Sequence, residues 1–142
     1  FSENENRARV TSAVVTGLFI SGDDFSDAGS PLGKERARKF LTNPSVDALV
    51  RLKKSFRPIE GNTGNRAASI FSSVVKGNYY LAAFNYSKQP TNFSVVFSRI
   101  GLKTQEPVKV NELWRNMVGQ ATNVLTIRLA PMDAAIYELV TR

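Results

Sequence analysis

The residues of this chain most able to do chemistry are carboxylates, and two of them, Asp23 and Asp24, directly follow an apolar run at 18–20. Two carboxyl groups can act together as acid and base, or as acid and nucleophile, only when both face the same reacting atom. Adjacent residues of an extended chain point to opposite faces, although a loop conformation would relax this constraint. We therefore predict that Asp23 and Asp24 are not a catalytic pair, and we assign no catalytic residue to the chain.

The chain contains no histidine and no cysteine. Their absence excludes disulfides, thiolate nucleophiles, imidazole bases and the commonest zinc ligands, so these residues cannot build a Ser/His/Asp hydrolase site. No spaced run of acidic residues has the pattern of a calcium-binding loop. We expect no cofactor and no bound metal.

The formal net charge of +7 is concentrated in one stretch. Between Lys34 and Arg57 there are eight basic residues against two acidic ones, interleaved with apolar residues at helical spacing. We interpret them as the solvated outer face of amphipathic helices and expect no nucleic-acid partner. The alternative, an anion- or nucleic-acid-binding domain, would require these charges to form one exposed surface. No apolar run approaches the roughly 20 residues of a bilayer span, so no membrane partner is expected.

The elements that position these residues begin with a helix. Ser2 and Glu5 have the capping-box spacing of a helix N-terminus. Apolar residues at helical spacing predict one buried stripe, made by Val10, Ala13, Val14, Gly17 and Leu18. The opposite side of the helix is predicted to carry Arg7, Arg9, Thr11 and Ser12.

A buried strand and further helices follow within the first 60 residues. The run 18–20 suits a short strand buried on both faces, followed by a loop of small and acidic residues. Helical spacing resumes at 34–41 and stops at Asn43, after which Ser45 can cap a further turn or two. The turn-rich stretch 60–65 marks the expected domain boundary.

The second half of the chain carries the alternation typical of strands. The hydrophobic period changes from about 3.6 to 2 after Ala67, and Gly77-Asn78 suits a hairpin turn between the first two runs. Six short antiparallel strands predict a β-sandwich, with runs at 69–76, 79–86, 92–99, 107–114, 123–129 and 134–140.

The first half is too short to be a free domain. Its single strand would be apolar on both faces, yet it has no partner strand within the chain. A buried strand flanked by helices is the repeating unit of α/β architectures, so the remaining units are expected upstream. The chain starts at Phe1 without a methionine, which we interpret as a cut chain.

Four stretches, taken in order, carry a resemblance to a known family. Two of them, 3–12 and 17–24, combine a capped helix with an apolar run that ends in two aspartates. The third is Phe-Leu-Thr-Asn-Pro-Ser-Val at 40–46, and the fourth comprises 81–87, Glu112-Leu113-Trp114 and 129–135. Together they resemble the C-terminal end of the α-galactosidase group, glycoside hydrolase family 27 and its relatives in family 36. At 133–134, Asp-Ala stands where the family commonly has His-Gly.

The resemblance implies a parent enzyme with a (β/α)₈ barrel that cleaves terminal α-galactosides or α-N-acetylgalactosaminides with retention. The fold class is then α+β, with the last β/α unit of a truncated barrel at 1–60 and a C-terminal antiparallel β-sandwich at 61–142. The expected partners are the upstream barrel of the parent chain and the parent's carbohydrate substrate. The chain leaves localisation open, and extracellular and periplasmic locations both fit such a parent.

The resemblance also implies roles for the acidic loop. Retention requires two carboxyl groups about 5–5.5 Å apart, and in the family both aspartates come from strands upstream of anything present here. The chain alone is therefore expected to be inactive. Asp24 matches a family aspartate after the last barrel strand, which implies that Asp24 and Asp23 lie at the rim of the substrate pocket, although the family usually has asparagine at the position of Asp23. The alternative for Asp24 is a loop carboxylate that binds backbone amides.

Aromatic residues of the second half raise one further possibility. A sugar-stacking platform, which would make the sandwich a carbohydrate-binding module, could be formed by Trp114, Tyr79, Tyr80 and Tyr86. Trp114 follows Val108 and Val110 at even spacing, so we predict that it lies in the core with them. The module would require several aromatic residues exposed on one face.

Without the barrel, the apolar stripe of the first helix should be exposed. We expect the chain to self-associate through Val10, Val14 and Leu18, or its N-terminal segment to be disordered.

Overall fold

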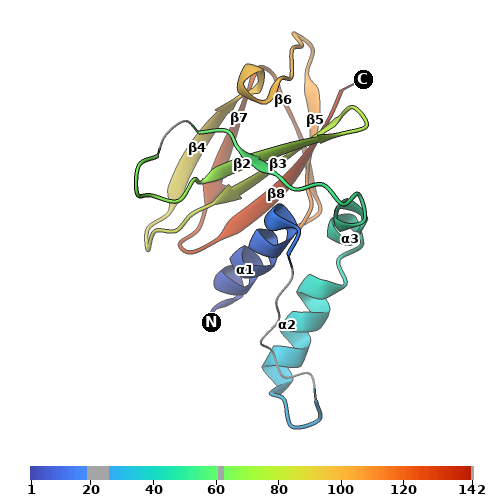
Figure 1. Cartoon of the computed structure of the whole chain (residues 1–142), viewed down its shortest axis with the longest axis vertical. Coiled ribbons are helices and arrows are strands. Elements are labelled where there is room, and N and C mark those ends of the chain that lie inside the picture. The colour runs from blue at the N-terminus through green and yellow to red at the C-terminus, as the bar shows by residue number, and fades with distance from the viewer. Residues whose placement is uncertain (19–25, 61–62, 142) are drawn as a thin grey trace.

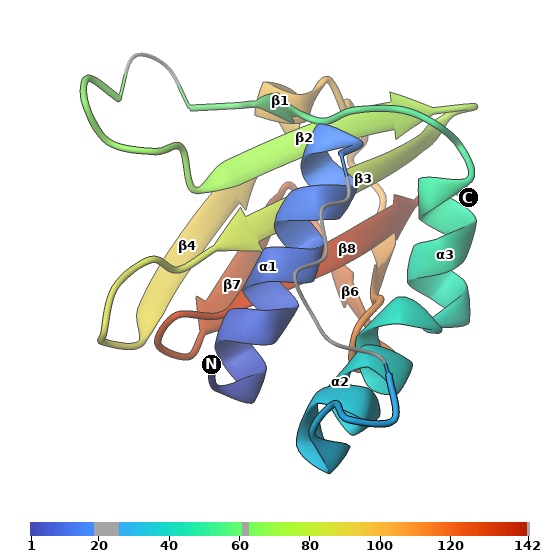
Figure 2. The same ribbon diagram turned by 60° about the horizontal axis from the view of Figure 1, so that its bottom comes forward.

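The computed structural model describes residues 1–18, 26–60 and 63–141, and these form three layers (Figure 1). Helices form one outer layer, a six-stranded sheet forms the middle, and a two-stranded sheet forms the other outer layer. Figure 2 shows the helices along one face of the large sheet, with β4 (Thr91–Val96) and β7 (Val124–Leu129) on its far side. The large sheet is therefore covered on both faces.

Helix α1 (Glu3–Thr16) begins where the sequence predicts. The Ser2 hydroxyl accepts from the Glu5 amide, and the Glu5 carboxylate accepts from the Ser2 amide, which completes the capping box. The helix ends at Gly17, whose φ of 69° is the left-handed conformation that glycine adopts without strain.

Helix α2 (Pro31–Leu41) begins three residues before the predicted helix and is capped by the Ser30 hydroxyl, which accepts from the amide of Gly33. The strand expected at 18–20 lies outside the described residues except for Leu18, which is not part of a strand. None of the helices in the described ranges combines the length and apolar character needed to cross a membrane.

Helix α3 (Pro44–Val50) is capped by Asn43, whose side-chain oxygen accepts from the amides of Ser45 and Val46. The prediction that Ser45 caps this helix is wrong by two residues. Pro44 occupies the first helical position, where a backbone N–H would have no helical partner, so proline starts this helix as readily as it ends the previous one.

The apolar stripe of α1 is buried, contrary to our expectation of an exposed stripe. Val10 and Val14 are only 7% and 9% exposed, because α2, α3 and Phe56 pack against them. Leu18, at the end of the stripe, is 63% exposed. Val10 and Val14 therefore do not form the predicted surface for self-association.

The six-stranded sheet is antiparallel throughout. Its strand order is β1-β2-β3-β8-β5-β6, with bounds β1 Arg57–Pro58, β2 Ile70–Val75, β3 Asn78–Phe84, β8 Ala134–Val140, β5 Val108–Glu112 and β6 Met117–Ala121. Strands β4 and β7 pair antiparallel as the second sheet, and a 3-10 helix at Phe97–Ile100 follows β4. Each of the six predicted runs overlaps one of these strands, although β3 and β4 begin one residue before their runs.

Strands β1 and β6 were not predicted from the sequence. Strand β6 reads Met-Val-Gly-Gln-Ala and is exposed on both faces, so no alternation marks it. The β2–β3 hairpin turns at Lys76-Gly77, one residue before the predicted turn. These two residues have the positive φ angles, 51° and 82°, that a two-residue type I′ turn requires.

Two hydrophobic cores lie on the two faces of the large sheet. Successive residues of β3 alternate between them: Ala82 and Phe84 face the helix-side core, whereas Leu81 and Ala83 face the intersheet core. In β7 the predicted alternation is present, because residues 125, 127 and 129 are buried and the residues between them are exposed. The sheet thus joins both outer layers into one packed unit.

Candidate functional site

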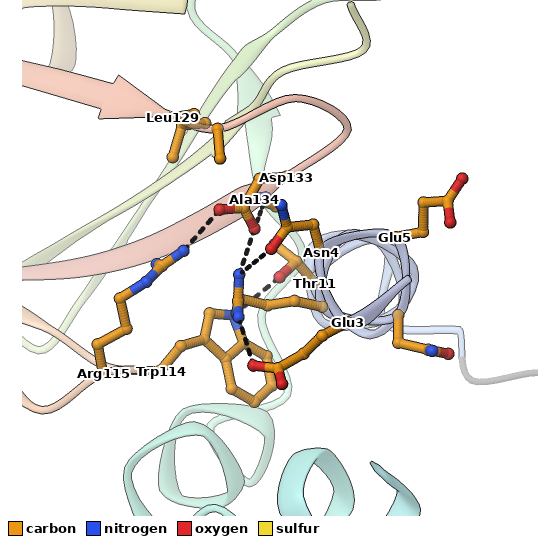
Figure 3. Close-up of polar contacts among 12 residues, drawn as sticks. Glu3, Asn4, Glu5, Thr11, Trp114, Arg115, Leu129, Asp133 and Ala134 are labelled. Atoms are coloured by element: carbon orange, nitrogen blue, oxygen red, sulfur yellow. Dashed lines mark hydrogen bonds and ion pairs between the residues drawn. The ribbon is translucent and has the colours of Figure 1, made fainter. Parts of the chain in front are cut away.

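Asp23 and Asp24, which the sequence places at a substrate pocket, lie outside the described residues. Their role therefore stays a prediction. Within the described residues, buried polar side chains gather at the junction between α1 and the β7–β8 turn (Figure 3). No group of three or more acidic residues in these ranges is arranged to hold a metal ion.

Asp133 is the centre of this junction and is only 2% exposed. Its Oδ1 atom accepts hydrogen bonds from Arg7 Nη1 and from the backbone N–H of Ala134, the latter at 2.8 Å. Its Oδ2 atom accepts from Arg115 Nη2 at 2.6 Å. Figure 3 shows Arg115 and α1 approaching this carboxylate from opposite sides. Asp133 is therefore held between two guanidinium groups.

Each arginine also binds a second carboxylate. Arg7 donates from Nη2 to Glu3, one turn earlier in α1, at 2.9 Å. Arg115, in the β5–β6 turn, donates from Nη1 to Glu112 at 3.0 Å. Lys39 adds an exposed contact to Glu3 at 2.7 Å. We call the connected set the Asp133 cluster: Glu3, Arg7, Glu112, Arg115 and Asp133.

The Asp133 cluster is suited to holding charges in place. All three of its carboxylates are ion-paired with an arginine. Burial raises the pKa of Glu112 above its ordinary value of 4.5, and its contacts with Arg115 act in the opposite direction. Burial also raises the pKa of Tyr137 to about 12, and the Glu112 charge adds to this shift. The arrangement is that of a structural joint between helix and sheet.

A second buried contact joins α1 to the β5–β6 turn. Trp114 Nε1 donates to Thr11 Oγ1 at 2.9 Å, and the indole meets the Phe40 ring edge-on with centroids 5.6 Å apart. The prediction that Trp114 is a core residue is confirmed at 9% exposed. Its core is the helix-side one, whereas Val108 and Val110 face the intersheet core, because β5 ends before Trp114 and the turn redirects its side chain.

The aromatic residues do not form a common exposed face in the described part of the chain. Tyr80 is buried and donates to Glu138, and Tyr79 is half-buried and donates to the Gly101 carbonyl. Tyr86 is half exposed and stacks on Phe84. A sugar-stacking platform requires several aromatic residues exposed together, and Trp114, Tyr79, Tyr80 and Tyr86 do not meet this condition.

Sequence reasoning missed the buried polar side of α1. Arg7 and Thr11 were expected to face solvent, but they are 6% and 0% exposed. Helix α1 packs between α2 and α3 on one side and β8 on the other, so its polar residues are buried along with its apolar stripe. The sequence carries no clear signal for this burial, because only the structure shows that Asp133 is buried and therefore requires cationic partners.

A comparison with known protein families identifies the second half of the chain. The model of the alpha-galactosidase C-terminal beta-sandwich domain matches residues 67–139, just over half of the chain. The chain belongs to this family. The resemblance drawn from the sequence motifs is thereby confirmed. No curated protein sequence is similar enough to count as a match.

Solved structures share the fold of this α-galactosidase C-terminal domain and of the helices before it. Alpha-galactosidase I from Mortierella vinacea has a TM-score of 0.77 at 12% identity, over 99% of this chain and 36% of that one. A family 27 β-L-arabinopyranosidase from Geobacillus stearothermophilus has a TM-score of 0.73 at 22% identity, over 99% and 31%. An isomalto-dextranase from Arthrobacter globiformis has a TM-score of 0.79 at 19% identity, over 100% and 24%.

The chain therefore spans about a third or less of the length of these structural relatives. The expected fold class, α+β, is confirmed: N-terminal helices precede antiparallel sheets, as at the end of a barrel followed by a β-sandwich. Glu112, Arg115 and Asp133 lie inside the range matched by the α-galactosidase C-terminal domain, whereas Arg7 lies outside it. The Asp133 cluster thus ties this domain to the helix that precedes it.

Replacing Asp133 by asparagine should destabilise the protein strongly. We expect Asp133→Asn to lower the free energy of unfolding by about 3–5 kcal/mol, because the buried guanidinium of Arg7 loses its buried counter-charge and keeps only the half-exposed Glu3. Adding Arg7→Met should recover part of this loss by removing the buried cation that lost its buried partner. Urea denaturation followed by circular dichroism measures both effects. The control is Glu3→Gln at the exposed end of the cluster, which should cost less than about 1 kcal/mol. A double-variant loss equal to the sum of the single losses would contradict the coupling.

Glu112 should make stability depend on pH. Since its pKa is raised above 4.5 in the folded state, the folded protein binds this proton more tightly than the unfolded chain. The contribution of Glu112 to the free energy of unfolding should therefore fall as pH rises from about 4.5 through the folded pKa. Urea denaturation at a series of pH values measures the slope, and Glu112→Gln should remove this downward component. Identical slopes for the two proteins would refute the assignment.

Proposed function

We propose that the chain is the C-terminal part of a retaining glycoside hydrolase that acts on terminal α-galactosides or α-N-acetylgalactosaminides. In this proposal residues 1–60 close the parent's (β/α)₈ barrel, and residues 61–142 form a β-sandwich that supports it. The chain by itself is inactive, because the catalytic carboxylate pair belongs to the upstream part of the barrel.

The family match over residues 67–139 is the observation that carries this proposal. The structural likeness adds support, because it covers 99% of the chain and so includes the helices at 1–60. One of the relatives with that likeness is named an α-galactosidase. The C-terminal end of such an enzyme would therefore be expected to have helices followed by a β-sandwich, as this chain does.

The length of the relatives supports an upstream barrel. The chain covers 36% and 31% of two of them, which leaves about 250–310 residues of each, close to the typical size of about 250 residues for a (β/α)₈ barrel. The part of each relative that this chain does not cover is therefore long enough to hold the rest of a (β/α)₈ barrel.

The helical layer also has an open groove where further barrel elements could pack. This groove of about 770 Å³ lies between the C-terminal half of α1 and α3, and the segment after α3 completes it. Its floor is apolar, and its lining includes Ala13, Val14, Leu41, Val46 and Leu49. In a barrel, helices of this kind cover the outer surface of buried strands, so an apolar groove on this side agrees with the proposal.

The two buried carboxylates among the described residues agree with an inactive chain. Retention requires a pair about 5–5.5 Å apart that flanks the glycosidic bond. Glu112 and Asp133, the two buried acids, are both bound by Arg115. A carboxylate so engaged cannot readily act as nucleophile.

Activity assays test the proposal directly. The 142-residue chain should release no nitrophenol from nitrophenyl α-galactoside, whereas the protein encoded by a reading frame that extends upstream of Phe1 should release it. Nitrophenyl α-N-acetylgalactosaminide, which carries an acetamido group in place of the 2-hydroxyl, tests the alternative specificity. Hydrolysis by the purified 142-residue chain would refute inactivity, and an inactive longer protein would refute the assigned reaction.

We further propose that Asp24, with Asp23 beside it, lies at the rim of the parent's substrate pocket. In the longer protein, Asp24→Asn should lower kcat/KM by about tenfold or more, the effect of losing one hydrogen bond to a charged group. The control is Asp27→Asn, an exposed acid of the same loop, which should leave kcat/KM unchanged. If Asp24→Asn lowers thermal stability but leaves KM and kcat intact, Asp24 is instead a loop carboxylate that binds backbone amides.

A further inference from the structure

The two edges of the large sheet differ in how they are protected. At one edge β1 carries Arg57 and Pro58, and a charge and a proline are what proteins commonly use to prevent strand addition. At the other edge β6 has five residues and neither charge nor proline. In the described part of the chain, β6 pairs with β5 alone. Its outer row of backbone N–H and C=O groups is therefore available to another strand.

The side chains of β6 are apolar and unusually exposed. Met117 and Val118 are 62% and 68% exposed. Cross-strand pairing to β5 fixes their directions: Gly119 lies opposite Val110 and so faces the two-stranded sheet, together with Met117. Val118 lies opposite Asn111 and faces the side of the helices. Both faces of this edge thus present apolar surface to solvent.

Each face of β6 also borders a groove. The β6–β7 groove, of about 650 Å³, is lined by Leu125 and Leu129 of β7 and by Tyr137 of β8. The β6–α3 groove, of about 390 Å³, is lined on the helix side by Leu49 and Leu52. A strand added beside β6 would place alternate side chains over these two grooves.

We propose that β6 pairs antiparallel with β6 of a second copy of this chain, about a two-fold axis at Gly119. This register pairs all five residues of the strand: Met117 lies opposite Ala121 of the second copy, and Val118 lies opposite its Gln120. The two Val118 side chains are then diagonal neighbours on one face, at a separation that side chains can bridge. The six-stranded sheet continues through the axis into a sheet of twelve strands.

A second copy fits this edge because no like charges meet across the axis. The five paired residues are uncharged, and Arg115 next to them is already neutralised by Glu112 and Asp133. Gly119 at the axis has no side chain, so the two backbones can approach closely. An isologous two-fold contact also closes after two copies, so it gives a dimer and not a fibre.

The contact is small, so the dimer should depend on protein concentration. It should strengthen with added salt, because each copy carries a net charge of +7 and salt screens their repulsion. The proposal replaces the predicted self-association through α1 and does not depend on which reaction the parent catalyses.

Analytical ultracentrifugation of the full 142-residue chain tests the surface. The wild-type chain should show a concentration-dependent dimer, and Val118→Lys should weaken it about tenfold or more, because two like-charged lysines then lie as diagonal neighbours across the axis. The matched control is Val50→Lys, which makes the same change at an exposed position on α3 (51% exposed). This variant should dimerise as the wild type does. A strictly monomeric wild-type chain, or a dimer weakened by Val50→Lys and not by Val118→Lys, overturns the proposal.

Cross-linking tests the register, because the chain has no cysteine of its own. Gly119 has no positive φ and nothing within 4 Å of an added Cβ atom, so Gly119→Cys should fold normally. In the proposed register the two new Cα atoms lie about 4.5–5.5 Å apart, within the range that a disulfide bridges. Mild oxidation should convert Gly119→Cys to a covalent dimer, and Val50→Cys should remain a monomer under the same conditions. Equal cross-linking of the two variants would overturn the register.

Discussion

The carboxylate of Asp133 is buried, and it is compensated only when Arg7 and Arg115 reach it from two directions. A buried carboxylate without cationic partners carries a desolvation penalty of several kcal/mol, so the structure must bring both arginines into place. Arg7 precedes Asp133 by 126 residues, whereas Arg115 comes from the hairpin between β5 and β6. The position of α1, the β5–β6 turn and the start of β8 are therefore determined together.

The large sheet extends this dependence to the remaining layers. Its central strands β3 and β8 are apolar on both faces, so each face requires a cover. The helices cover one face and β4 with β7 cover the other. The helix-side core includes Phe56 and Val75 and so crosses the turn-rich stretch at 60–65, where the hydrophobic period changes. The hydrophobic period thus changes at 60–65, whereas the helix-side core contains residues from both sides of this stretch.

The solved structures that this chain matches are longer proteins, of which it covers 24–36%. An α-galactosidase, a β-L-arabinopyranosidase and an isomalto-dextranase share the fold of this chain at TM-scores of 0.73 to 0.79. Enzymes named for different glycosides thus share the fold of this chain, so this fold alone does not determine which glycoside an enzyme cleaves. The buried carboxylates of this chain, Glu112 and Asp133, are both ion-paired with arginine.

The sequence by itself determined the local features: the cap of α1 at Ser2, a strand in each of the six alternating runs, and the family to which the chain belongs. These follow from contacts between near neighbours and from periodicity, which a sequence displays directly. Tertiary structure decided which polar residues are buried. Arg7 and Thr11 look solvent-facing in the sequence, and only the packing of β8 against α1 gives them buried partners more than a hundred residues away. Strand β6 was missed because both of its faces are exposed, so its sequence shows no alternation of apolar and polar residues. Only its pairing with β5 in the tertiary structure defines it as a strand.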